Sequence, residues 1–265
     1  MLLPFLLIAI TKQFSIIGHR GIIGSFFLNH PLASPYPPPP YDPPPGPILV
    51  ATPITAVPDV LKLVRKINRQ HDLVFIANGD TPYFDNPRHL EHNVPMTNSL
   101  LFFGPPSPSN NNHKIVKSPF VPSYVIGRHA NFLQSLLHHF ELPCQVVTNY
   151  TKMDKLRFGK LCWSASMWLL CETYKSNVGE IVTHHERELI ELVSEFGGDK
   201  NDIDLVLKYS EGSMEQVVPS TKLAIAEFSG RNGHLLRKQT KKEQKFHREL
   251  LHRVVELRSI LLDYA

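Results

Sequence analysis

FSIIGHRGIIGSFF, at residues 14–27, is the stretch that decides the fold of this 265-residue chain. An apolar run is followed by a glycine-containing turn and then by a second apolar run. This order is typical of a buried strand that passes through a tight turn into a helix. A strand, turn and helix of this kind open the dinucleotide-binding βαβ fold, so we expect residues 14–27 to begin a parallel sheet.

The glycine turn matches the dinucleotide-binding fingerprint G-x-G-x-x-G in part. Gly21 and Gly24 occupy the second and third glycine positions, which permit close approach to a pyrophosphate and close packing of helix on strand. His19 stands at the first glycine position, with Gly18 beside it. The helix N-terminus would offer N–H groups to a phosphate, and Arg20 would add charge. Gly18, Arg20, Gly21 and Gly24 are therefore candidate cofactor-binding residues; the alternative is a tight turn without a ligand.

A proline-rich segment, SPYPPPPYDPPPGP at 34–47, follows where the second strand of a nucleotide-binding unit belongs. Proline lacks a backbone N–H and fixes φ, so the segment can form neither a helix nor a central strand. The acidic residue that should follow the second strand and bind the adenosine ribose is missing, because Asp42 lies inside the proline run. The segment is either a spacer, which we favour, or a polyproline II ligand for an SH3- or WW-type domain. A gene-model or splice error is a third interpretation.

Composition narrows the class of protein. Lys and Arg give a net charge of +4 but are spread along the chain, with one denser stretch at 237–248, so we expect no nucleic-acid partner. Cys162 and Cys171 lie nine residues apart on opposite faces of one predicted helix and cannot pair, which favours a reducing, cytoplasmic location. The sequence has no CxxC or HExxH spacing, so we expect no metal.

The apolar N-terminus, MLLPFLLIAI at 1–10, lacks the basic region and cleavage site of a signal peptide. It is also too short to span a bilayer. We expect it to form a buried element that leads into the first strand, and we expect no membrane partner.

The remaining chain predicts alternating strands and helices followed by helices alone. The predicted strands are PILVATP (47–53), DLVFIANG (72–79), NSLLFFG (98–104) and CQVVTN (144–149), and the predicted helices between them cover 56–67 and 127–141. Beyond residue 152 the predicted elements are helices at 153–174, 181–196, 202–209, 214–228 and 241–262. The predicted fold class is α/β then all-α: an incomplete Rossmann-like parallel domain at 1–150, interrupted at 34–47, and a helical domain at 151–265.

Several motifs, in this order, resemble ketopantoate reductase-like proteins of the 6-phosphogluconate dehydrogenase-like superfamily, and uncharacterised members above all. They are IIGHRGIIG (16–24), PILVATP, LVFIANG, GRHANFLQSLLHHFELPCQVV (127–147), KLCWSASMWLL (160–170), NVGEI (177–181) and AEFSGRNG (226–233). The resemblance implies hydride transfer, with NADP or NAD as cofactor, to or from a small keto or hydroxy acid. It also implies homodimerisation through the C-terminal helices.

The resemblance assigns two catalytic residues. Lys160 matches the lysine that protonates the substrate carbonyl as hydride arrives, a role that burial favours because it makes the proton easier to give up. Glu227 matches a glutamate that contacts the substrate hydroxyl and takes part in catalysis. Asn78 matches an asparagine near the nicotinamide, and it is a candidate cofactor-binding residue. The alternatives are a lysine that reaches solvent at a helix start, a helix-terminal acid and a turn-forming Asn-Gly.

The substrate-binding positions depart from the family pattern. Ser164, Asn177 and Asn232 are the candidates, but Ser164 stands where the family usually has asparagine. Trp168 replaces a second asparagine, and Val178 aligns with a third, with Asn177 one place away. These departures remove amides that hold a small hydroxy acid. The alternative function is therefore a catalytically degenerate family member, or a truncated gene product, that acts as a dimerisation or interaction protein.

Overall fold

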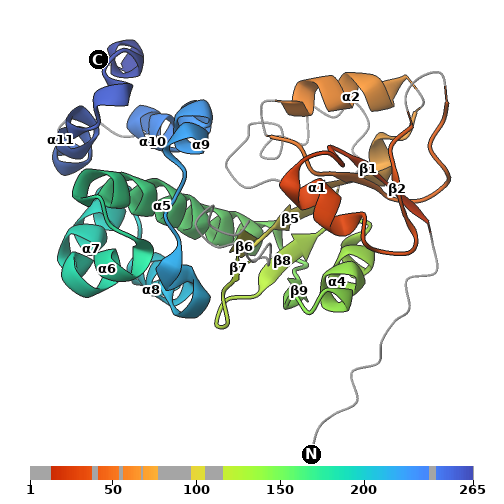
Figure 1. The fold of residues 1–265 in the computed structure, drawn as a ribbon, viewed down its shortest axis with the longest axis horizontal. Coiled ribbons are helices and arrows are strands. Elements are labelled where there is room, and N and C mark those ends of the chain that lie inside the picture. Colours follow the sequence, from red (N-terminus) through yellow and green to blue (C-terminus); the bar gives the residue numbers. More distant parts are fainter. Residues whose placement is uncertain are drawn as a thin grey trace, which may run out of the picture. The chain divides into compact units, whose positions relative to one another are not determined.

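The computed structural model describes residues 13–37, 41–53, 56–66, 68–76, 97–104, 116–238 and 243–264 (Figure 1). These residues form two compact units. The first contains the described residues up to Ile76 together with 97–101 and 122–153, and the second contains 102–121 and the chain from 154 onward. The element predicted at the N-terminus lies outside the described residues.

The first unit is built on a seven-stranded sheet in the order β2-β1-β3-β4-β5-β8-β9. Its strands are β1 (Phe14–Ile17), β2 (Ala33–Pro35), β3 (Ile48–Val50), β4 (Leu73–Ile76), β5 (Thr97–Leu100), β8 (Ser123–Ile126) and β9 (Cys144–Val146). Neighbouring strands run parallel except β5 and β8, which are antiparallel. The predicted parallel α/β sheet is confirmed, whereas β8 was not predicted.

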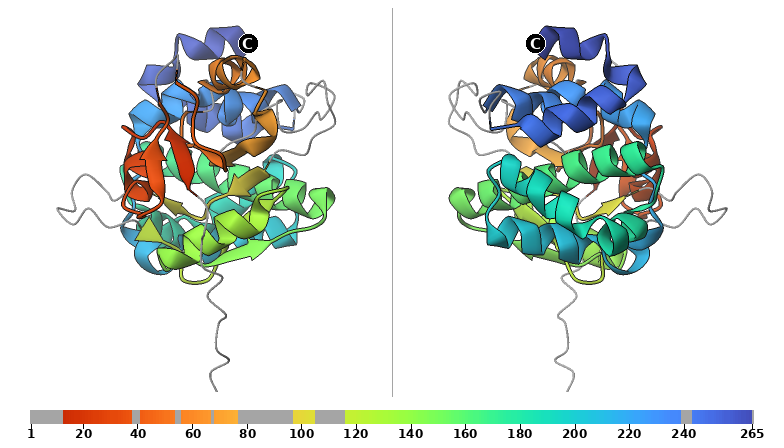
Figure 2. Two further views of the ribbon diagram at one scale, coloured as in Figure 1. Left: turned by 90° about the vertical axis from the view of Figure 1, so that its right-hand side faces the viewer. Right: turned by 90° about the vertical axis from the view of Figure 1, so that its left-hand side faces the viewer.

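Helices cover both faces of this sheet (Figures 1 and 2). On one face, α2 (Val57–Arg65) packs its apolar side on alternate residues of β3 and β4. On the other, Phe14 of β1 has its ring centroid 5.3 Å from that of Phe132 in α4 (Ala130–His139). Phe140, at the end of α4, contacts the aromatic end of α1 (Ile22–Phe27). Each large apolar side chain buried in this way contributes about 1.5–3 kcal/mol.

The expectation that the second strand is missing is wrong. β2 pairs in parallel with β1, with Phe14 opposite Ala33 and Ile16 opposite Pro35. It is three residues long and lies at the edge of the sheet, where a proline can leave its missing N–H on the unpaired side. The proline run therefore allows a short edge strand, although it allows no central one.

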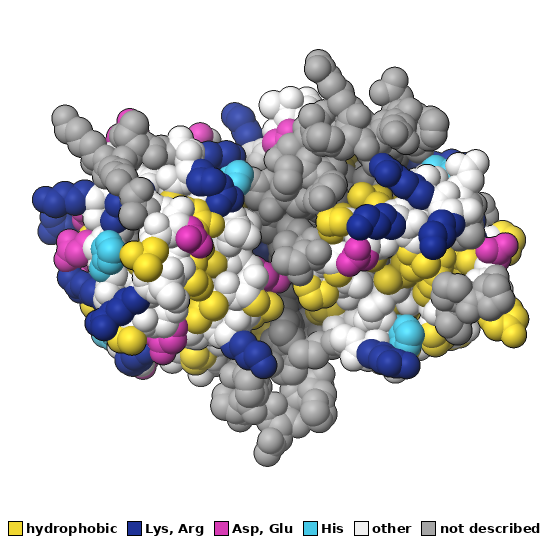
Figure 3. Space-filling model, turned by 90° about the horizontal axis from the view of Figure 1, so that it is seen from above, with side chains coloured by type: hydrophobic (Ala, Val, Ile, Leu, Met, Phe, Trp, Pro, Cys, Tyr) yellow, Lys and Arg dark blue, Asp and Glu magenta, His cyan; other side chains and the backbone are white. Residues whose placement is uncertain are grey.

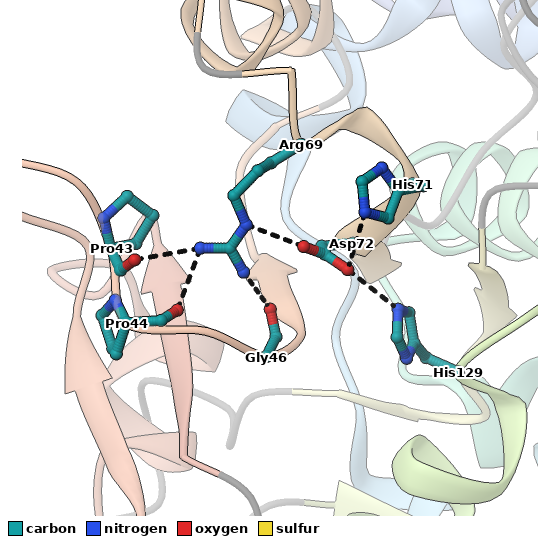
Figure 4. A network of polar contacts seen from close by, with 7 residues as sticks. All are labelled: Pro43, Pro44, Gly46, Arg69, His71, Asp72 and His129. Atoms are coloured by element: carbon teal, nitrogen blue, oxygen red, sulfur yellow. Dashed lines mark hydrogen bonds and ion pairs between the residues drawn. The ribbon is translucent and has the colours of Figure 1, made fainter.

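Residues 36–47 connect β2 to β3, on the opposite side of β1. A parallel connection needs about a dozen residues, usually an α-helix, and here the described residues of the connection contain neither helix nor strand. The guanidinium of Arg69 donates hydrogen bonds to the carbonyls of Pro43, Pro44 and Gly46, at 3.0, 2.9 and 2.5 Å (Figure 4). The connection is thus held by the turn that precedes β4.

The second unit is helical, apart from a short antiparallel pair, β6 (Phe103–Gly104) with β7 (Val116–Lys117). Its helices are α5 (Tyr150–Tyr174, from residue 154), α6 (Val178–His184), α7 (Glu186–Glu195), α8 (Lys200–Ser210), α9 (Thr221–Ala226), α10 (Asn232–Lys238) and α11 (Lys245–Arg253). Residues 165–171 of α5 are buried on every side, as expected of a central helix. Figure 1 shows α6, α7 and α8 along one side of α5 and α9, α10 and α11 along the other.

Three predicted helices are divided in the structure. The helix predicted at 181–196 is interrupted at His185, whose backbone is not helical and whose ring stacks on Tyr174 at 3.7 Å. Pro219 separates a 3₁₀ turn (Gly212–Gln216) from α9, because proline cannot donate within a helix. The last predicted helix ends at Arg253, and 3₁₀ turns follow at Val255–Leu257 and Ile260–Tyr264. α10 was not predicted.

Three further observations concern the surface charge, the thiols and the hydropathy of the helices. Figure 3 shows the described Lys and Arg side chains of one face dispersed among acidic and apolar ones. All three cysteines are buried free thiols. Among the described residues, no helix is long and apolar enough to cross a membrane.

Candidate functional site

The glycine turn between β1 and α1 is closely packed. Gly18 has a φ of +85°, which side-chain-bearing residues rarely adopt, and a Cβ there would lie 2.4 Å from the carbonyl oxygen of Ala51. A Cβ on Gly24 would lie 2.2 Å from the carbonyl oxygen of Gly18, so this glycine allows α1 to pack on the turn. Gly21 precedes the first residue of α1, and no side chain caps this helix end. Arg20 is exposed in the same turn.

This turn meets the end of β3 at the switch point of the sheet. The chain leaves β1 for β2 on one side and later enters β3 on the other, and ligands of open α/β sheets bind at the carboxyl ends of such strands. Ala51 donates its N–H to the carbonyl of Ile17 at 2.9 Å, which joins the two strand ends. Beside them, Thr52 Oγ1 is buried and has no hydrogen-bond partner among the described residues. A buried hydroxyl without a partner is costly, which makes Thr52 a candidate residue of this turn.

The residues of the first unit fit the pyrophosphate of a nicotinamide dinucleotide better than they fit its adenosine ribose. Gly21 is exposed at the uncapped start of α1, where a pyrophosphate can approach the backbone, whereas Gly18 and Gly24 are filled in by protein backbone and shape the turn; Thr52 adds a hydroxyl. The end of β2 continues into Tyr36 and proline, so no carboxylate follows the strand directly. Burial raises the pKa of Tyr36, and the charge of Asp42, which belongs to the proline-rich connection, acts in the same direction. Asn78, the remaining candidate cofactor-binding residue, lies outside the described residues.

Lys160 lies in the first half of α5 and is buried, with 6% of its surface exposed. Its ammonium donates a hydrogen bond to Tyr209 Oη at 3.1 Å. The ammonium also lies 4.6 Å from the ring centroid of Phe102 and 4.5 Å from that of Tyr209. Burial, followed by the charge of Arg231, lowers the pKa of Lys160 well below its ordinary value. A buried amine of this kind gives up its proton more readily than a surface lysine.

Glu227 lies at the end of α9 and forms an ion pair with Arg231, which is four residues further on. Both side chains are largely buried, at 13% and 15% exposed, and Arg231 Nε has no acceptor among the described residues. Arg231 connects the two candidate catalytic residues electrostatically, since it pairs with Glu227 and lowers the pKa of Lys160. With Lys160 protonated, the three groups carry a net positive charge.

The candidate substrate-binding residues are engaged in local contacts. Ser164 donates its hydroxyl to the carbonyl of Leu161 at 3.1 Å. Asn177 caps α6 in a reciprocal pair with Glu180: its side-chain oxygen accepts from the Glu180 N–H at 2.8 Å. Asn232 is buried, and its side-chain oxygen lies 2.9 Å from the Nε2 of His247. The side-chain oxygens of all three residues are thus used within the helical unit.

Sequence reasoning missed Thr52, Tyr209 and Arg231. Thr52 lies inside the motif PILVATP, and Arg231 lies inside AEFSGRNG, next to Asn232. Tyr209 is 49 residues from Lys160 and carries no local signal. Among the described residues, no three His, Cys, Asp or Glu side chains are arranged to hold a metal ion.

No protein-family model and no curated protein matches the sequence. Solved structures do match. 2-Dehydropantoate 2-reductase from Methylococcus capsulatus aligns with a TM-score of 0.59 over 96% of this chain and 97% of that chain, at 13% identity. The dimeric ketopantoate reductase from Staphylococcus aureus aligns with a TM-score of 0.57 over 96% and 100% of the two chains, at 11% identity.

D-Mandelate dehydrogenase, solved with NADH and anilino(oxo)acetate, aligns with a TM-score of 0.59 over 91% of this chain and 97% of that chain, at 14% identity. Identities this low show the fold alone. The chain therefore has the fold of the ketopantoate reductases, an α/β unit followed by a helical unit, and the resemblance seen in the sequence is confirmed at the level of the fold.

Proposed function

We propose that the chain is an NAD(P)-dependent oxidoreductase that transfers hydride between a nicotinamide and the carbonyl carbon of a small 2-oxo acid. The observation that carries this proposal is Lys160: a buried amine on α5, held by Tyr209, in the fold of the ketopantoate reductases. Fold alone does not define function, so the proposal rests on the chemistry of this residue.

The first unit provides the cofactor side of the proposal. When bound, the nicotinamide cofactor would supply or accept the hydride. Gly21 would let its pyrophosphate approach the backbone at the start of α1, in a turn shaped by Gly18 and Gly24, and Arg20 and Thr52 would add a charge and a hydroxyl.

Lys160 would act as the general acid. As the carbonyl carbon gains hydride, the carbonyl oxygen gains negative charge and takes a proton from the ammonium of Lys160. The product is a hydroxyl group and a neutral amine. Burial favours the neutral amine, which is why the lowered pKa of Lys160 suits this direction of proton transfer.

The charge of the second unit suits an acid as substrate. With Lys160 protonated, Lys160 and Arg231 carry two positive charges against one negative charge on Glu227, so the three groups together attract an anion. Arg231 Nε has no acceptor among the described residues, and a substrate carboxylate would supply one. Glu227 would orient Arg231 and contact the substrate hydroxyl.

A specific observation favours a second candidate, a non-catalytic member of this fold that acts in dimerisation or interaction. The side-chain oxygen of Asn177 caps a helix, that of Asn232 contacts His247, and Trp168 fills the core of the helical unit. Each of these contacts is made to another residue of the helical unit. In this case the fold would persist without turnover.

Consumption of NADH and NADPH with a panel of 2-oxo acids separates the two candidates. Lys160→Met should abolish turnover while cofactor binding remains. Lys152→Met, which changes an exposed lysine of the same helix, should leave turnover unchanged. Full turnover in Lys160→Met would exclude Lys160 as the proton donor, and binding without turnover of any acid would favour the non-catalytic candidate.

A further inference from the structure

We infer that Tyr209 is the positioning residue that fixes the ammonium of Lys160 for proton transfer; this inference rests on the proposed function. Tyr209 lies in the last turn of α8 and Lys160 on α5, so the contact joins two helices of the same unit. Tyr209 Oη accepts a hydrogen bond from Lys160 Nζ at 3.1 Å.

Three aromatic rings surround the same ammonium. Its nitrogen lies 4.5 Å from the ring centroid of Tyr209, 4.6 Å from that of Phe102 and 6.0 Å from that of Trp163. The hydroxyl sets the direction of one N–H, and the rings limit the positions that the flexible lysine chain can occupy. The amine is thus placed before any substrate binds.

Tyr209 is itself held in place. Its ring packs against Trp163, with centroids 4.4 Å apart, and edge-on against Phe102 at 4.8 Å. The indole N–H of Trp163 donates to Ser210 Oγ at 2.9 Å, and Ser210 donates in turn to the carbonyl of Val206 at 2.8 Å. A positioning residue must have a fixed rotamer, and these contacts provide one.

The hydroxyl of Tyr209 acts on the pKa of Lys160 in the direction opposite to burial. Burial and the charge of Arg231, which is paired with Glu227, favour the neutral amine. An accepting oxygen favours the charged form, so its removal should lower the pKa of Lys160 further. The tyrosine is buried, which raises its own pKa and keeps it neutral as an acceptor.

Tyr209→Phe tests this role because it removes one oxygen and keeps the ring. Activity that needs a protonated lysine is lost as pH rises through the lysine pKa, so the basic limb of the kcat profile should move about one unit to lower pH. At neutral pH kcat should fall about tenfold, with the KM for cofactor unchanged. Tyr264→Phe is the matched control, since Tyr264 Oη accepts from a different cation, Arg237 Nη1. Ser210→Ala should give a smaller shift in the same direction.

A second readout does not require turnover. Full-length protein labelled with ¹³C at the lysine ε carbons is titrated by NMR, and Lys160→Met identifies the Lys160 signal. Tyr209→Phe should lower the titration midpoint of that signal, and Tyr264→Phe should not. An unchanged midpoint in Tyr209→Phe overturns the inference, as does an unchanged kcat profile. If the midpoint shifts but the wild-type protein turns over no 2-oxo acid, the proposed function fails and the placement of Lys160 by Tyr209 stands.

Discussion

Arg69 Nε donates a hydrogen bond to Asp72 Oδ2 at 2.7 Å, and both side chains are largely buried, at 17% and 14% exposed. Asp72 fixes one edge of the guanidinium, and the remaining N–H groups bind three backbone carbonyls of the proline-rich connection (Figure 4). Asp72 also lies 3.5 Å from the Nε2 of His129, at the start of α4. The described residues of this connection contain no helix. The pair of Arg69 and Asp72 therefore holds the connection to the turn that precedes β4.

Arg69→Lys tests that role. Lysine has a single charged group and cannot bind Asp72 and three carbonyls at once, so the free energy of unfolding in urea should fall by about 2–3 kcal/mol. Arg65→Lys changes an exposed arginine of α2 and should have little effect. Equal stability of the two variants would contradict the role of Arg69.

Gly24→Ala should lower stability, whereas Gly21→Ala should lower cofactor affinity. A Cβ added at Gly24 would meet backbone at 2.2 Å, so Gly24→Ala should lower the thermal unfolding midpoint by several degrees. At Gly21 the nearest atom would be 3.3 Å away and the backbone is extended, so the protein should fold. Cofactor affinity should nevertheless fall, because the added methyl group occupies the space of the pyrophosphate. Unchanged affinity in Gly21→Ala would mean that the turn holds no phosphate.

Thr52→Val should separate stability from binding. The buried hydroxyl has no partner among the described residues, so its replacement should leave the unfolding free energy unchanged or raise it by about 1 kcal/mol. If a cofactor uses the hydroxyl, its affinity should fall about tenfold, and Thr52→Ser should restore it. A Thr52→Val protein with normal affinity would exclude the hydroxyl from the site.

His247 should make the protein sensitive to acid. Its burial lowers its pKa from 6.5 to about 3 in the folded state. Between these values the unfolded chain binds a proton that the folded one excludes, so the unfolding free energy should fall by about 1.4 kcal/mol per pH unit as the pH drops below 6.5. Urea unfolding at pH 7, 6 and 5 should show a shallower dependence for His247→Gln. His252→Gln, at an exposed position, should behave as wild type; a common slope for all three would refute the assignment.

Sequence patterns predicted those parts of the fold that depend on local signals. Apolar runs located β1, β3 and β4, and the glycine spacing located the turn before α1. The short strand β2 at Ala33 was not predicted, because proline is excluded from central strands but tolerated at an edge. The 3.6-residue repeat also continued across Pro219 and Val254, where the backbone leaves the helix.

The candidate site was predictable only in part, for a similar reason. The motif Asn177-x-x-Glu180 is a capping-box pattern, so the structural role of this asparagine could have been read from the sequence. The contact of Tyr209 with Lys160 joins residues far apart in the chain, and no periodicity encodes it. The unpartnered hydroxyl of Thr52, judged among the described residues, depends on the packing around it.

The central claim is that this chain binds a nicotinamide cofactor and uses Lys160 on a bound 2-oxo acid. Titration of the full-length protein with NADH and NADPH, followed by cofactor fluorescence, tests it most directly. We predict saturable binding of at least one cofactor, weaker binding in Gly21→Ala, and wild-type affinity in Lys160→Met. Absence of binding to the wild-type protein at millimolar cofactor would contradict the claim.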